Sequence, residues 1–220
     1  DRTRAKWLAE ARSQAAEAPL TPAWLAHELG EVVKDDDWVV ANTGLDGWIK
    51  RLWKWEQPHQ FVRTSGLGYG LGIALGAALA NKGTGRLTID IQPDGDMLFT
   101  PAGLWTAAHH EIPMLTVMYN NRSYFNDELH QETVARRRNR PVSNRWIGQS
   151  IGSPEVDIAN LVNSYGGVGI GPVKDVKDLE AAIKKGVEAL QAGKVVLIDV
   201  QVNPGEERSA RSTIEDRKTD

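Results

Sequence analysis

Residues 89–131 read IDIQPDGDMLFTPAGLWTAAHHEIPMLTVMYNNRSYFNDELHQ, and this stretch decides the fold of the 220-residue chain. It predicts a strand that breaks at residues 93–96 (PDGD), then a helix, then a second strand over residues 114–119 that runs into NN. A strand, turn, helix and strand of this length form one βαβ unit, whose parallel strands end side by side. Asp94 and Asn121 follow those two ends. Two hard oxygen donors at that edge suit Mg²⁺ that carries a phosphorylated ligand.

The bulk composition is that of an ordinary soluble globular domain, with 41% hydrophobic and 25% charged residues. The net charge of −3 gives no electrostatic reason to expect nucleic acid or an anionic membrane as a partner. The chain has no cysteine, which excludes disulfides and thiolate chemistry. Because no apolar run approaches a membrane span and no signal peptide is recognisable, we expect a cytoplasmic protein.

Strand-like and helix-like segments alternate along most of the sequence. The expected strands cover residues 38–41, 61–63, 86–91, 114–119, 167–170 and 195–202. The expected helices cover residues 23–33, 45–53, 73–80, 102–110, 157–165 and 176–191, with Thr21-Pro22 and Thr100-Pro101 as helix starts. This alternation favours a doubly wound α/β fold with a mostly parallel sheet of about six strands and helices on both faces.

Three parts are expected along the chain. Residues 1–20 form an N-terminal arm or linker helix, residues 21–203 the main domain, and residues 204–220 a charged tail. The chain begins with DRTR rather than Met and reads like the middle of a linker, so we expect a piece of something larger. Residues 122–156 show no clear period, and within them we expect residues 122–153 to form a loop that acts as a lid.

Other site types fit less well. Gly66, Gly68 and Gly70 alternate and do not give the spacing of a dinucleotide-binding loop, although a nucleotide-binding α/β domain stays open as an alternative. The pair His109-His110 faces different directions on a helix and has no third ligand at metal spacing. The arginines at 136–138 are a solvated face or, alternatively, meet an anionic substrate group. Neither a Walker A loop nor a nucleophile elbow is present.

At this point the sequence resembles the thiamine diphosphate-dependent enzymes, specifically the acetolactate synthase and 2-oxoacid decarboxylase group. The signature of that family, Gly-Asp-Gly followed further on by Asn-Asn, stands here as PDG and NN. The resemblance covers residues 20–203 and matches the C-terminal, diphosphate-binding domain of the family. Three further stretches agree in order: NTG at 42–44, SGLGY at 65–69 and GKVVLIDV at 193–200.

The resemblance implies a metal site and a diphosphate site. Asp94, Asn121 and the backbone carbonyl of Ser123 would bind Mg²⁺, with diphosphate oxygens and a water completing the octahedron. The amides of Gly95 and Asp96 would meet the diphosphate itself.

Further cofactor and substrate contacts are also implied. Leu67 would hold thiamine diphosphate in its V shape, and the backbone groups of Ser65 and Leu67 would hydrogen-bond its aminopyrimidine edge. The residues expected to close over the diphosphate are Thr43, Gly44 and Asp46. The residues expected to face the substrate are Tyr124, Phe125 and His130.

Two departures from the family pattern shape the expected function. Pro93 replaces the first glycine of the signature, which is tolerable at a strand end. The glutamate that activates the cofactor comes from a separate pyrimidine-binding domain in this family, and nothing in the sequence resembles that domain. The chain should therefore hold half of an active site and need a partner chain or domain in a hetero-oligomer or homo-oligomer.

The resulting expectation is a thiamine diphosphate- and Mg²⁺-binding subunit or fragment of a carbon–carbon lyase or ligase. Its small-molecule substrate would be a 2-oxoacid or a 2-hydroxyacyl-CoA-type compound, used in decarboxylation or carboligation. A non-catalytic assembly subunit with the same fold is the alternative from another class.

Overall fold

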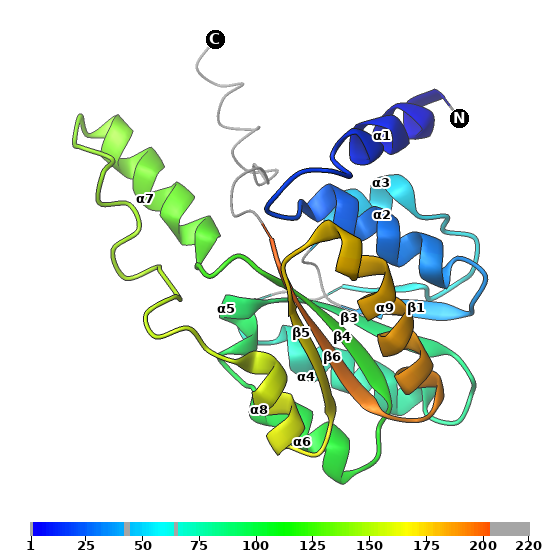
Figure 1. Cartoon of the computed structure of the whole chain (residues 1–220). Coiled ribbons are helices and arrows are strands. Elements are labelled where there is room, and N and C mark those ends of the chain that lie inside the picture. The colour runs from blue at the N-terminus through cyan, green and yellow to red at the C-terminus, as the bar shows by residue number, and fades with distance from the viewer. Residues whose placement is uncertain (1, 42–44, 64–65, 203–220) are drawn as a thin grey trace.

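The computed structural model describes residues 2–41, 45–63 and 66–202, apart from the side chain of Asp46 (Figure 1). Within these residues one sheet of six strands has the order β2-β1-β3-β4-β6-β5, and each neighbouring pair is parallel. The strands are β1 Trp38–Ala41, β2 Phe61–Val62, β3 Leu87–Pro93, β4 Met114–Asn120, β5 Val168–Val173 and β6 Val195–Gln201. The expected doubly wound α/β fold is confirmed.

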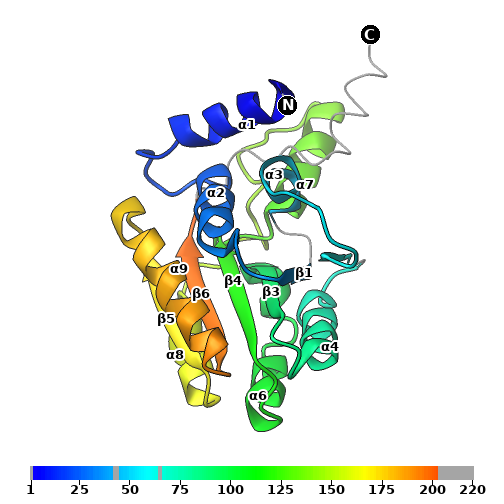
Figure 2. The same ribbon diagram turned by 90° about the vertical axis from the view of Figure 1, so that its right-hand side faces the viewer.

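Helices cover both faces of the sheet (Figures 1 and 2). One face carries α2 Pro22–Val33, α3 Asp46–Leu52 and α9 Val176–Gln191, and α1 Arg2–Ser13 packs outside them against α2 and α3. The apolar residues of these helices form one core cluster with the strands. The other face carries α4 Gly70–Asn81, α5 Asp94–Met97, α6 Ala102–His109 and α8 Ile158–Ser164, which share a second cluster.

The central strand β4 shows why the sheet is covered on both sides. Leu115 and Val117 point into the first cluster, whereas Met114 and Met118 point into the second. All four side chains are inaccessible to solvent. A parallel strand buried on both faces reads as a continuous apolar run, which is the pattern that predicted it.

One predicted loop is wrong in part. Residues 125–137 form the helix α7 Phe125–Arg137, which projects from the body of the domain (Figure 1). None of its residues is buried, and no residue between 121 and 157 belongs to either core cluster. Without a buried face there is no periodic apolar pattern to predict a helix.

The helix α6 begins at Ala102 as predicted, but the capping role expected for Thr100 is wrong, whereas that of Thr21 is confirmed. Thr21 accepts a hydrogen bond from the amide of Trp24 at 3.2 Å, as an N-cap should. In α6 the N-cap is Pro101 and no side chain caps the helix. The hydroxyl of Thr100 donates instead to the carbonyl of Gly68 at 3.4 Å. Gly68 belongs to residues 66–69, the glycine loop that precedes α4.

No helix among the described residues is long and apolar enough to cross a membrane.

Candidate cofactor site

Asp94 stands at the carboxyl end of β3 and is only 1% exposed. Within the described residues neither of its carboxylate oxygens accepts a hydrogen bond. Burial raises the pKa of this carboxyl to about 6, and the peptide N–H groups of Asn121, Gly95 and Arg122 nearby oppose that shift. Those groups approach the carboxylate, but none has the geometry of a hydrogen bond. Two buried carboxylate oxygens without a hydrogen bond are groups that a cation could satisfy.

The structure brings Asn121 to Asp94, as the βαβ argument predicts. Asn121 follows β4, and its side-chain oxygen accepts a hydrogen bond from the amide of Ser123 at 2.9 Å. A carbonyl oxygen has two lone pairs, so one remains for a cation. A crevice of about 20 Å³ beside Asp94 has room for one small ion or water.

The first asparagine of the pair has a structural role that the sequence analysis missed. Asn120 donates to the carboxylate of Asp199 on β6 at 3.0 Å and accepts from the amide of Arg122 at 3.1 Å. Burial raises the pKa of Asp199 to about 6, and the hydrogen bond from Asn120 opposes the shift. Asn120 thereby anchors the turn to the neighbouring strand and leaves the side chain of Asn121 available. The partner, Asp199, is 79 residues away in sequence, so no local signal predicts the contact.

Gly95 is required where α5 meets the start of the α7 segment. A Cβ atom at Gly95 would lie 2.7 Å from the ring of Tyr124, so a larger residue would force that ring away. Tyr124 also meets Phe99 edge-on, with 6.1 Å between ring centroids. Tyr124 is therefore held beside the turn that carries Asp94 and Gly95, and its role toward the substrate stays a prediction.

The other two residues expected to face the substrate lie further along the chain, on α7. Phe125 begins α7 and is half-buried, whereas His130 is exposed and lies 4.0 Å from the carboxylate of Asp127. Among the described contacts, none joins either residue to Asp94. The role of Phe125 and His130 toward the substrate stays a prediction.

The side chain of Asp96 links α5 to the glycine loop. One of its carboxylate oxygens accepts from the amide of Gly68, and the other accepts from the side-chain amide of Gln92 at 2.8 Å. The loop beside it presents Leu67 and Tyr69 to solvent, 72% and 62% exposed, next to Phe99. These apolar side chains lie near the unpartnered carboxylate of Asp94. Such a combination suits a ligand with a charged end and a ring system.

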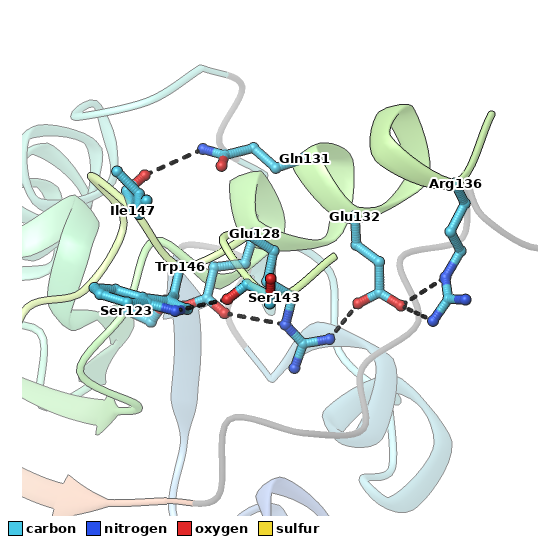
Figure 3. Close-up of polar contacts among 9 residues, drawn as sticks. Ser123, Glu128, Gln131, Glu132, Arg136, Ser143, Trp146 and Ile147 are labelled. Carbon is cyan, nitrogen blue, oxygen red and sulfur yellow. Dashed lines mark hydrogen bonds and ion pairs between the residues drawn. The ribbon is translucent and has the colours of Figure 1, made fainter. Parts of the chain in front are cut away.

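A ladder of charged side chains runs from Ser123 along α7 (Figure 3). The hydroxyl of Ser123 donates to Glu128, Arg145 lies between Glu128 and Glu132, and Arg136 donates to Glu132 at 2.6 and 2.9 Å. The hydrogen bonds from Arg136 and Arg145 lower the pKa of Glu132.

The base of this projecting segment is hydrogen-bonded through its backbone. The amide of Tyr124 donates to the carbonyl of Gln149 at 2.9 Å, and the amide of Ile151 donates to that of Arg122 at 2.7 Å. The loop that carries Ser123 is therefore joined both to α7 and to the chain that returns from it.

Four of the expected cofactor contacts cannot be placed. Thr43, Gly44 and Ser65 lie outside the described residues, and so does the side chain of Asp46.

The parallel sheet, the orphaned carboxylate at its carboxyl edge and the two glycine-containing turns beside it define a cofactor-binding α/β domain. Comparison with known proteins makes the family specific. The sequence profile described as "Thiamine pyrophosphate enzyme, C-terminal TPP binding domain" matches residues 42–200. This chain belongs to that family, which confirms the resemblance seen in the sequence.

Its relatives include the acetolactate synthase isozyme 3 large subunit of Escherichia coli (strain K12). That protein is 25% identical over 191 residues, which cover 85% of this chain and 31% of the relative. The mitochondrial acetolactate synthase catalytic subunit of Saccharomyces cerevisiae is 26% identical over 218 residues, or 91% of this chain and 30% of the relative.

Among solved structures, the thiamine diphosphate-dependent 4-hydroxybenzoylformate decarboxylase of Rhodococcus jostii RHA1 is similar, with a TM-score of 0.70 and 25% identity. The match covers 85% of this chain and 33% of that one. This chain thus spans roughly a third of the length of the proteins that it resembles.

Proposed function

We propose that this chain binds thiamine diphosphate through Mg²⁺ and forms half of the active site of a carbon–carbon lyase or ligase. The substrate would be a 2-oxoacid or a 2-hydroxyacyl-CoA-type compound. The observation that carries the proposal is Asp94, a buried carboxylate whose oxygens have no partner among the described residues. An ion pair with a divalent cation would offset the cost of burying that charge.

The residues of this chain fit the roles that the family membership suggests. Asp94 and the side-chain oxygen of Asn121 are hard donors that suit Mg²⁺, and the carbonyl of Ser123 follows in the same turn. Mg²⁺ normally keeps few protein ligands and takes the remainder from phosphate and water. The amides of Gly95 and Asp96 would receive the diphosphate at the same turn.

The cofactor, when bound, supplies the carbon nucleophile and electron sink for breaking or forming the bond next to a carbonyl group. The residues of this chain would hold the cofactor and orient it. Tyr124, packed over Gly95, would help to exclude water from the metal side of the site. The acid that activates the cofactor would come from a pyrimidine-binding domain on a partner chain or on another part of a longer polypeptide. The site is then completed only in an oligomer or a multidomain protein.

Calorimetric titration tests the proposal. Thiamine diphosphate with Mg²⁺ is added to the protein alone and to the protein assembled with its partner half. We expect binding that disappears in EDTA and in Asp94→Ala. Unchanged binding in Asp94→Ala contradicts the assigned metal site. If no binding occurs even in the full assembly, the chain is a non-catalytic assembly subunit instead.

A further inference from the structure

The carboxylate of Asp96 clasps the glycine loop to the end of β3. The amide of Gly68 donates to one oxygen, and the side chain of Gln92 donates to the other at 2.8 Å. Gln92 is completely buried on β3, so the carboxylate is held from the core side. The carbonyl of Gly68 accepts in turn from Thr100 at 3.4 Å. Both polar backbone atoms of Gly68 are thus tied to the segment that follows Asp94, the N–H through Asp96 and the carbonyl through Thr100.

This clasp fixes more than Gly68, because a peptide group is planar. In a trans peptide the N–H of one residue and the C=O of the residue before it point in opposite directions. The Leu67–Gly68 peptide is not among the cis peptides of the described chain. Directing the N–H of Gly68 to Asp96 therefore directs the carbonyl of Leu67 away from the carboxylate.

The backbone on either side of Leu67 supports the same arrangement. Gly66 and Gly68 have φ angles of +107° and +75°, which glycine adopts without strain. A Cβ atom on Gly68 would also lie 3.1 Å from that of Phe99. Leu67 itself makes little contact with the protein and is 72% exposed. Its position is consequently set by its neighbours' backbone and by the clasp, rather than by packing of its own side chain.

We propose that the carboxylate of Asp96 is a positioning residue, which sets Leu67 and its carbonyl for the thiamine part of the cofactor. This inference rests on the proposed function, in which Leu67 meets the ring system and the amide of Asp96 meets the diphosphate. A positioning role also explains why the acidic side chain of Asp96 stands beside the proposed diphosphate site. Both carboxylate oxygens accept N–H donors from the protein, so the charge is engaged by Gln92 and Gly68.

Two variants and two ligands distinguish a positioning role of Asp96 from a general loss of structure at the site. Asp96→Ala removes the clasp, whereas Asp96→Asn keeps an acceptor oxygen for Gly68, and the amide of Gln92 can turn its oxygen toward the new NH₂ group. The ligands are thiamine diphosphate and inorganic pyrophosphate, each with Mg²⁺. Pyrophosphate reports the metal and diphosphate contacts alone, because it lacks the rings that would meet Leu67.

We expect Asp96→Ala to weaken thiamine diphosphate binding about tenfold, the size expected for losing a hydrogen bond to a charged group. Pyrophosphate binding should change less than about threefold, and Asp96→Asn should bind both ligands nearly as the unmodified protein does. Adding Leu67→Ala to Asp96→Ala should cost little more than either change alone, because both act through the same contact.

Hydrogen exchange at the amide of Gly68 provides a readout without any ligand. The exchange should accelerate in Asp96→Ala and stay slow in Asp96→Asn. Equal weakening of both ligands in Asp96→Ala, or full thiamine diphosphate affinity, overturns the inference and leaves the proposed function intact. Failure of the unmodified protein in its full assembly to bind either ligand overturns the proposed function and this inference together.

Discussion

At the scale of single residues, Asp94 carries an energetic cost that a ligand would relieve. We expect Asp94→Asn to stabilise the ligand-free protein against urea by about 1–3 kcal/mol, because a neutral amide of the same shape is cheaper to bury than an unpartnered carboxylate. The same variant should lose Mg²⁺-dependent cofactor binding. An exposed acid on another loop, changed in Asp35→Asn, is the matched control and should leave the free energy of unfolding within about 0.5 kcal/mol. A destabilised Asp94→Asn would show that the native carboxylate is already satisfied.

His27 on α2 gives a pH dependence that is separate from the cofactor site. Its Nε2 accepts from Arg12 at 3.1 Å, and its Nδ1 lies 3.8 Å from Glu28. Desolvation by burial lowers its pKa below 6.5; the charge of Arg12 acts the same way, and that of Glu31 opposes the shift. Below that pH the unfolded chain therefore binds more protons than the folded one, so stability falls as the pH falls.

We expect His27→Gln, which keeps an acceptor for Arg12 but does not titrate, to flatten this pH dependence. Urea unfolding at about pH 7.5 and about pH 5.5 measures the effect. Over this interval the free energy of unfolding should fall more, or rise less, in the unmodified protein than in the variant. Asp94 and Asp199, whose pKa values are raised to about 6, act alike in both proteins, so the difference isolates His27. Equal changes would mean that His27 does not contribute.

At the scale of elements, α7 depends on its charged ladder because it has no buried face. We expect Arg145→Met to speed tryptic cleavage at the arginines between 136 and 140 several-fold. The global free energy of unfolding should change by less than about 1 kcal/mol, as is usual for exposed ion pairs. Lys184→Met is the control, because it breaks a 2.6 Å ion pair with Glu180 on α9, a helix that buries six residues. Cleavage that is no faster in Arg145→Met would assign the order of α7 to other contacts.

Replacing glycine by alanine should have opposite effects on the free energy of unfolding at Gly169 in a strand and at Gly76 in a helix. A Cβ atom at Gly169 on β5 would lie 1.9 Å from the carbonyl oxygen of Ala159 on α8, so Gly169→Ala should destabilise the protein by about 2 kcal/mol or more. Gly76 is exposed within α4 and has open space around it. Gly76→Ala should stabilise by about 0.5–1 kcal/mol. Chemical denaturation of both variants checks the pair, and a neutral Gly169→Ala would mean that α8 can move away from β5.

At the scale of the whole molecule, ligand binding should appear as stability. With free thiamine diphosphate and Mg²⁺ at about 100 times the dissociation constant, unfolding should cost about 2.7 kcal/mol more than without them. EDTA should remove the increment, and Asp94→Ala should never show it. An increment that survives EDTA would point to a binding mode without the metal.

The sequence predicts most of this architecture, because parallel strands buried on both faces read as apolar runs between helices. β1 and α9 begin and end at the predicted residues. The proximity of Asp94 to Asn121 also follows from local order, since one βαβ unit aligns its strand ends. The roles assigned to those residues, and to Ser123, Gly95 and Leu67, stay predictions.

Contacts between distant parts of the chain could not be predicted in this way. The hydrogen bonds of Asp96 to Gly68 and of Asn120 to Asp199 span 28 and 79 residues and leave no mark on periodicity. The sequence does not predict the helix α7 either. None of its residues is buried, so it has no apolar pattern with the period of a helix.

That exposed helix has a consequence for how such a protein can change over evolutionary time. Residues 121–157 begin at the turn beside Asp94, yet none of them belongs to a hydrophobic cluster. Substitutions along α7 can alter the surroundings of the cofactor edge with little penalty for folding, because the sheet and its two cores do not depend on them. If the proposed function holds, this is the segment in which new substrate preferences can arise while the scaffold stays the same.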